Sequence, residues 1–204
     1  MLRVGLTGGI ATGKSYVVSV LRELGCEAID ADEVAHAMIA PGGPAYDEVV
    51  GEFGPEILGA GGVVDRGRLG AIVFADPERR ARLEAIVHPQ VIAAQERWLA
   101  EVAARRPDAV AVVEAALLIE AGAHRRVDKV VVVYCAPASQ LERLMARGGL
   151  AREAALWRIE SQLPAEEKLK YADYAIDTTG SFAETRRQVE TIHAELDRLA
   201  RGRV

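Results

Sequence analysis

A glycine-rich segment near the start of the chain, GLTGGIATGKS, contains residue types that can bind phosphate. Its spacing is G-x-x-x-x-G-K-[ST], formed by Gly8, Gly13, Lys14 and Ser15. Glycines let the backbone curl so that successive N–H groups point at phosphate oxygens. The lysine brings a point charge to the β- and γ-phosphates, and the serine brings a hydroxyl to Mg²⁺. The spacing therefore predicts binding of ATP or GTP, with phosphoryl transfer or nucleotide hydrolysis as the chemistry.

The segments on either side of this loop have the patterns that such a site needs. Residues 2–7 form a short apolar run, which indicates a buried strand. Residues 13–24 place apolar side chains at the helical period. A helix that begins at the end of the loop directs the positive end of its dipole at the phosphates.

The rest of the chain alternates between strand and helix patterns. Further strands are expected at 26–30, at the start of 108–119, at 128–135 and at 174–178. Helices are expected at 32–40, 76–87, 90–105, 137–147, 151–162 and 182–201. Continuous apolar strands separated by helices predict an α/β fold with a parallel sheet of about five strands, covered on both faces.

Two regions interrupt this alternation. Turn signals within 41–64, followed by helical patterns up to residue 105, predict a helical insertion between the second and third strands. Residues 146–164 are rich in arginine and contain Gly148-Gly149, which predicts a mobile lid.

Composition narrows the functional classes. The 204 residues carry 25 Lys and Arg against 30 Asp and Glu, a formal charge of −5. Because an acidic chain is poorly suited to bind the phosphates of nucleic acid, we expect no nucleic-acid partner.

Cys26 and Cys135 have neither metal-ligand nor disulfide-framework spacing, and we expect two buried thiols. No apolar run approaches the ~20 residues of a membrane span. We expect a cytoplasmic protein without a membrane partner, as a monomer or small homo-oligomer.

Asp32 is the first candidate for chemistry outside the loop. It follows a strand that ends at Asp30, at the sheet edge where ligands bind in open α/β folds. A carboxylate there could orient or deprotonate an attacking hydroxyl, or hold a Mg²⁺-bound water. The alternative is that Asp30 or Asp32 caps the next helix, and Asp30 is the better cap if that helix begins at Ala31.

His88 and the lid arginines also have two interpretations. Pro89 disfavours helical geometry at His88, so this residue marks either a helix boundary or a ligand contact in the insertion. Arg143 and Arg147 are four residues apart and would share one helix face. They could bind phosphate or stack on a base, or they could belong to the solvated surface.

The missing residue types exclude one class of nucleotide-binding protein. The chain contains no asparagine, so it lacks the Asn-Lys-x-Asp segment with which regulatory GTPases recognise guanine. The length, the helical insertion and the arginine-rich lid favour a kinase that acts on a small metabolite.

With these segments in this order, the chain resembles the dephospho-CoA kinase family. The resemblance rests on GLTGGIATGKS, IDAD, LEAIVHP, ALLIE, RLMARGGLAREAALWRIESQ and KLKYADYAIDTTG, and covers about 180 residues. It implies transfer of the ATP γ-phosphoryl group to the ribose 3′-hydroxyl of dephospho-CoA, the last step of CoA synthesis, with Mg²⁺ as cofactor. It also implies a P-loop core of five parallel strands, with a CoA-binding lobe and a lid.

The resemblance also assigns regions and residues. The core would comprise residues 1–31, 106–145 and 172–204, the CoA-binding lobe 32–105 and the lid 146–171. Asp32 would be the base at the acceptor hydroxyl, His88 and Leu117 would contact the acceptor, and Arg147 would act from the lid on the phosphoryl group or adenine. Contacts to the ATP phosphates would come from Gly8, Gly9, Ala11, Thr12, Gly13, Lys14, Ser15 and Tyr16, with Ser15 also binding the metal.

Three positions depart from the family pattern. Ala116 stands where proline is usual, Gly148 where aspartate is usual, and the IDTTG segment has threonines where asparagine is common.

Two other functions remain open at this point. The chain could be another small-metabolite or nucleoside-monophosphate kinase, or a non-catalytic ATP sensor. If Asp32 is not the base, Glu114 is the next candidate.

Overall fold

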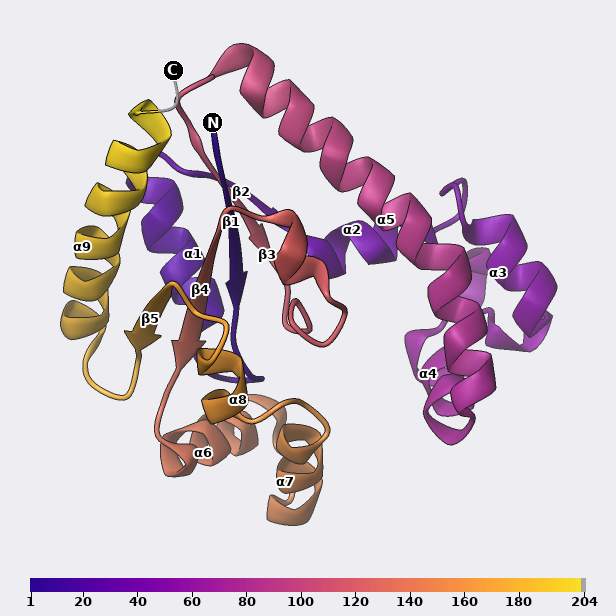
Figure 1. Cartoon of the computed structure of the whole chain (residues 1–204). Helices are drawn as coiled ribbons and strands as arrows, with labels where there is room; N and C mark the ends of the chain where they lie inside the picture. Colours follow the sequence, from indigo (N-terminus) through magenta and orange to yellow (C-terminus); the bar gives the residue numbers. More distant parts are fainter. Residues whose placement is uncertain (203–204) are drawn as a thin grey trace. The chain divides into compact units, whose positions relative to one another are not determined.

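A computed structural model describes residues 1–202 of the chain (Figure 1). Five strands form one sheet in the order β2-β3-β1-β4-β5, and the printed registers of β1 with β3, β1 with β4 and β4 with β5 are all parallel. The strands are β1 Leu2–Thr7, β2 Glu27–Asp30, β3 Val110–Glu114, β4 Lys129–Tyr134 and β5 Tyr174–Asp177. All five strands expected from the apolar runs are present, and the predicted α/β fold class is confirmed.

The central strands are apolar because both faces of the sheet are covered. In β4, Val131 and Val133 belong to a core that includes residues of α1 (Lys14–Glu23) and α9 (Phe182–Arg201). Val130 and Val132 belong to a second cluster, which contains Leu118 and contacts Leu169 of α8 (Ala165–Leu169). Successive side chains of a strand point to opposite faces, so β4 contributes to a core on each side of the sheet.

The chain divides into two compact units. Unit 1 contains residues 1–29 and the residues from 101 onward, and it includes the whole of β1, β3, β4 and β5. Two more of its helices are α6 (Pro137–Gly148) and α7 (Arg152–Glu160). The segment expected to be a lid, 146–171, contains the last residues of α6 and the whole of α7 and α8. Both cysteines are buried, as predicted, and burial raises the pKa of Cys26 to about 12. Burial also raises the pKa of Cys135, so neither thiol is a candidate nucleophile.

Unit 2, Asp30–Ala100, is helical, as expected for the insertion. Phe53, Ile57 and Leu69 lie in its buried core, and Arg79 stacks over the Phe53 ring at 4.5 Å. Its helical elements are α2 Ala31–Met38, α3 Tyr46–Phe53, η1 Pro55–Ile57, η2 Ala60–Gly62, α4 Arg66–Ala75 and most of α5 Pro77–Arg105. Among residues 1–202, no helix is both long and apolar enough to cross a membrane.

Helix α5 corrects one prediction. The sequence pattern predicted two helices, 76–87 and 90–105, with a break at His88-Pro89, but α5 runs through Pro89 without ending. Proline removes one helical N–H, and the carbonyl that loses its donor is four residues earlier, at Ala85. Ala85, His88 and Pro89 are all exposed, so water can hydrate that carbonyl. The apolar contacts of α5, including buried Val87, therefore outweigh the local preference for a break.

Candidate nucleotide and phosphoryl-transfer site

The predicted phosphate loop joins β1 to α1 and has an unusual backbone. Gly13 precedes α1 in the left-handed region, with φ 87°, where glycine is favoured. Ala11 has φ 60°, and it is the one non-glycine residue within 1–202 with positive φ. Gly8 lies so close to β4 that a Cβ atom would meet the Val133 carbonyl oxygen at 2.2 Å. The loop is curled tightly and held against the sheet, which is the shape that the glycine spacing predicted.

Lys14 lies over this curled backbone. Its Nζ donates hydrogen bonds to the carbonyl oxygens of Gly8 at 3.0 Å and Gly9 at 3.1 Å. The ammonium group is thus held at the loop, where it can also donate to a phosphate oxygen. Ser15, the next residue of α1, is exposed, and its hydroxyl is an oxygen ligand of the kind that Mg²⁺ uses together with nucleotide phosphates.

Thr12 and Tyr16, also predicted to contact phosphate, have defined internal partners. The Thr12 hydroxyl donates to the Gly9 carbonyl at 2.9 Å, inside the loop. The Tyr16 N–H donates to the Gly13 carbonyl at 3.1 Å, in the first turn of α1. The Tyr16 ring stands edge-on to that of Phe182, with centroids 4.7 Å apart. These contacts tie Thr12 to the loop backbone and pack Tyr16 at the start of α1 against Phe182.

Thr178, which directly follows β5, hydrogen-bonds to the phosphate loop, and Arg143 on α6 in turn hydrogen-bonds to Thr178. The Thr178 hydroxyl donates to the Thr12 carbonyl at 2.7 Å. Arg143, on α6, donates to the Thr178 hydroxyl at 3.1 Å and to its carbonyl at 2.6 Å. Arg147 is exposed in the last turn of the same helix. The spacing gave both arginines the same two interpretations, but the structure distinguishes them. Arg143 hydrogen-bonds within the protein, and Arg147 is exposed and accessible to a ligand.

The sequence reasoning missed three residues that support the loop. The sequence places Thr178 in a segment that differs from the family pattern and indicates no contact for it. Nothing in the sequence marks Gln140 or Gln162 as loop residues, yet both hydrogen-bond to the main chain of Ile10. Their positions far along the chain carry no local signal, although Gln162 lies inside the RIESQ segment that supported the family resemblance.

The cap of helix α2 separates Asp30 from Asp32. The Asp30 carboxylate accepts hydrogen bonds from the N–H groups of Asp32 at 2.7 Å and Glu33 at 3.2 Å. The helix begins at Ala31, and Asp30 is its N-cap, as the spacing favoured. The alternative in which Asp32 is the cap is wrong. Asp32 is the second residue of the helix and is exposed.

The remaining predicted site residues differ in exposure. His88 is exposed in the interior of α5, so its interpretation as a helix-boundary residue is wrong. Leu117, in the loop that follows β3, is 40% exposed. Glu114, the reserve candidate for the base, is the last residue of β3 and is partly buried. Among residues 1–202, no three His, Cys, Asp or Glu side chains gather as a metal site.

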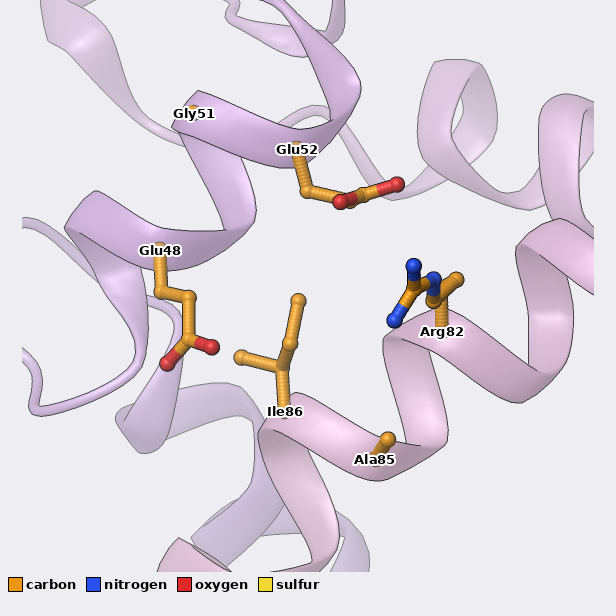
Figure 2. Close-up of a pocket in the computed structure, with 6 residues that line it drawn as sticks. All are labelled: Glu48, Gly51, Glu52, Arg82, Ala85 and Ile86. Carbon is orange, nitrogen blue, oxygen red and sulfur yellow. The ribbon is translucent and has the colours of Figure 1, made fainter.

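Unit 2 also contains a pocket of about 410 Å³ between α3 and α5, lined by Glu48, Gly51, Glu52, Arg82, Ala85 and Ile86 (Figure 2). Glu52 already pairs with Arg79 at 2.9 Å. With the Glu52 charge compensated by Arg79, the remaining charged lining residues are Glu48 and Arg82, whose charges are opposite and equal. The pocket lining therefore has no excess positive charge to bind the pyrophosphate of a CoA precursor. We do not assign the acceptor to this pocket.

A five-stranded parallel sheet whose first strand leads through a curled glycine loop and a lysine into a helix defines a P-loop kinase fold. A shikimate kinase from Bacteroides thetaiotaomicron shares this fold, with a TM-score of 0.50 at 17% identity over 96% of this chain and 98% of its own. Two structures are much more similar. TT1252 from Thermus thermophilus has a TM-score of 0.80 at 37% identity, with 96% and 97% of the two chains covered. Dephospho-CoA kinase from Campylobacter jejuni has a TM-score of 0.71 at 31% identity, with 99% and 98% covered.

The sequence comparisons identify the family. The family model described as dephospho-CoA kinase matches residues 2–184. A dephospho-CoA kinase from Geobacillus kaustophilus is 48% identical over 97% of this chain and 98% of its own length. The chain belongs to the dephospho-CoA kinase family, and the resemblance seen in the sequence is confirmed.

Proposed function

We propose that this protein transfers the γ-phosphoryl group of ATP to the ribose 3′-hydroxyl of dephospho-CoA and releases CoA and ADP. The observation that carries the proposal is the family match over residues 2–184, together with an intact phosphate loop in which Lys14 lies over the curled backbone. The acceptor oxygen forms a bond to the γ-phosphorus while the bond from that phosphorus to the β,γ-bridging oxygen breaks. ADP leaves with the electron pair of the broken bond.

The loop residues act on the donor side of this reaction. Phosphoryl transfer proceeds through a loose transition state, so catalysis depends chiefly on positioning and on charge. We assign Lys14 to the β- and γ-phosphates, because its ammonium group lies at the loop, and Arg147 to the transferring group, because it is an exposed cation in the segment that we assign to the lid. We assign further contacts with the ATP phosphates to the other loop residues, which are Gly8, Gly9, Ala11, Thr12, Gly13, Ser15 and Tyr16. Bound Mg²⁺, held by Ser15 and the phosphates, would supply further charge neutralisation.

On the acceptor side we assign Asp32 as the group that orients the 3′-hydroxyl and takes its proton. Asp30 already caps α2, so the exposed Asp32 carboxylate is not needed for that purpose. We place dephospho-CoA in the lobe formed by residues 32–105, with contacts from His88 and Leu117, and we assign residues 146–171 to the lid. The nucleotide core then comprises residues 1–31, 106–145 and 172–204. We place the protein in the cytoplasm, as a monomer or small homo-oligomer.

The test is ADP release with ATP alone and with ATP plus dephospho-CoA, repeated with a panel of other alcohol and nucleoside-monophosphate acceptors. We expect ADP only with dephospho-CoA, and a product with one more phosphoryl group by mass spectrometry. Lys14→Ala should lower turnover by at least about 10²-fold, as loss of one preorganised charge donor does. Lys129→Ala is the matched control, because Lys129 pairs with Asp173 at 2.7 Å and lies at the start of β4, outside the loop and the segment assigned to the lid. Acceptor-independent ADP release, or normal turnover in a folded Lys14→Ala variant, would contradict the assignment.

A further inference from the structure

Two glutamines hold the same residue of the phosphate loop. The Ile10 N–H donates to Oε1 of Gln162 at 2.8 Å, and Nε2 of Gln140 donates to the Ile10 carbonyl oxygen at 2.8 Å. These bonds fix the two peptide groups that precede Ala11, the residue with positive φ. A non-glycine residue stays in that region only where the surrounding contacts over-determine it.

The glutamines come from opposite ends of the α6–α7 segment. Gln140 lies in the first turn of α6, and Gln162 follows the end of α7. Between them, the buried residues Leu141, Leu144 and Ala155 form an apolar cluster that also contains Ile10 and Ala11. Ile10 and Ala11 are therefore packed against the α6–α7 helices, and Ile10 is hydrogen-bonded both to the first turn of α6 and to the residue two positions after α7.

The segment after Gln162 is held by further contacts within the same unit. The N–H of Leu163, the next residue, donates to Oε1 of Glu120 at 3.2 Å. Lys168 is fully buried, and its Nζ donates to both Glu120 carboxylate oxygens, at 2.7 and 2.9 Å, and to the Ala116 carbonyl at 2.9 Å. A buried cation with three good acceptors is hard to displace. Residues 162 and 163 thus link the phosphate loop to the loop that carries Leu117.

We propose that Gln162 is a positioning residue for ATP, through which the α6–α7 segment and the phosphate loop control each other. This inference rests on the proposed function. Gln162 occupies the Ile10 N–H and so holds the backbone in the curl that directs the following N–H groups to phosphate. Because Gln162 lies two residues after the end of α7, a displacement of that helix releases Ile10 and weakens the phosphate site. By linkage, ATP binding favours the helix position in which the contact is made.

The test replaces Gln162 with methionine, which keeps the length of the side chain and removes the acceptor. We expect the Ile10 amide to exchange hydrogen faster. The Kd for ATP, measured without an acceptor, and KM for ATP should both rise by about five- to tenfold, in line with loss of one hydrogen bond at a site held by several. KM for dephospho-CoA should stay near its wild-type value. Gln162→Glu keeps an oxygen acceptor and should restore slow exchange at Ile10.

Ser161→Ala is the matched control. The Ser161 hydroxyl donates to the Arg158 carbonyl within its own turn, so its removal should leave both readouts unchanged. If Gln162→Met does not fold, Gln162→Asn shortens the side chain by one methylene and tests the same contact. A folded variant with wild-type Ile10 exchange and wild-type KM for ATP would overturn the proposal, as would a loss of melting temperature with KM unchanged.

The same experiment separates this inference from the proposed function. Exchange at Ile10 and binding of ATP are measured without an acceptor, whereas the unmodified chain is assayed for dephospho-CoA-dependent ADP release. If that activity is absent while Gln162→Met still alters Ile10 exchange and ATP binding, the acceptor assignment fails and the role of Gln162 stands.

Discussion

The pair Asp30 and Asp32 offers the sharpest test, because the two carboxylates lie two residues apart and the structure gives them different tasks. Asp30 accepts two backbone hydrogen bonds at the start of α2, and Asp32 lies within the first turn of that helix. Asp30→Ala should cost about 1 kcal/mol of stability, the usual loss for an N-cap. In a chain of this size that lowers the melting temperature by about 2–4 °C. Asp30→Asn should cost almost nothing, since asparagine caps about as well.

Asp32→Asn should show the opposite pattern. The change keeps the shape of the side chain and removes one negative charge near the helix N-terminus, which costs no more than about 0.3–1 kcal/mol. If Asp32 takes the proton of the 3′-hydroxyl, turnover should fall by at least about 10²-fold with ATP affinity largely preserved. Thermal melting, ATP titration and ADP release on the same four proteins, wild type, Asp30→Ala, Asp30→Asn and Asp32→Asn, measure all of these quantities.

One result would refute this reasoning directly. A folded Asp32→Asn variant with normal turnover would leave Asp32 without a role in proton removal. Glu114, at the end of β3, would then be the next candidate for the base, and Glu114→Gln would be measured in the same assay.

The other predictions concern the loop and the lid. Gly8→Ala should disrupt ATP binding and cost at least about 1–3 kcal/mol, because the added Cβ would meet the Val133 carbonyl oxygen at 2.2 Å. Gly51→Ala is the control, because Gly51 lies within α3 and an added Cβ there would contact nothing within 4 Å. Alanine is favoured over glycine inside a helix, so this change should raise the melting temperature slightly. Wild-type melting and ATP affinity in Gly8→Ala would contradict the observed loop geometry. Hydrogen exchange in residues 146–152, which include Gly149 with φ 58°, should slow when ATP and dephospho-CoA are bound. Unchanged exchange at saturation would argue against a lid.

Much of the nucleotide site could be predicted from the sequence because its determinants are local. Gly8, Gly13, Lys14 and Ser15 lie within eight consecutive residues, and their backbone preferences and charges act over that short span. The same holds for the strands, whose apolar runs reflect burial on both faces of the sheet. The cap at Asp30 also follows from local spacing, once the helix begins at Ala31.

Only the tertiary structure decided which distant side chains support the loop. Gln140, Gln162 and Thr178 follow it by more than 120 residues, and nothing in their neighbourhoods distinguishes them from surface polar residues. Lys168 stands in the charged run AEEKLK, where an exposed position is expected, yet it is fully buried because Glu120 and the Ala116 carbonyl satisfy its charge. Pro89 stays inside α5 for a related reason: apolar packing of the helix outweighs a local preference that the sequence alone displays.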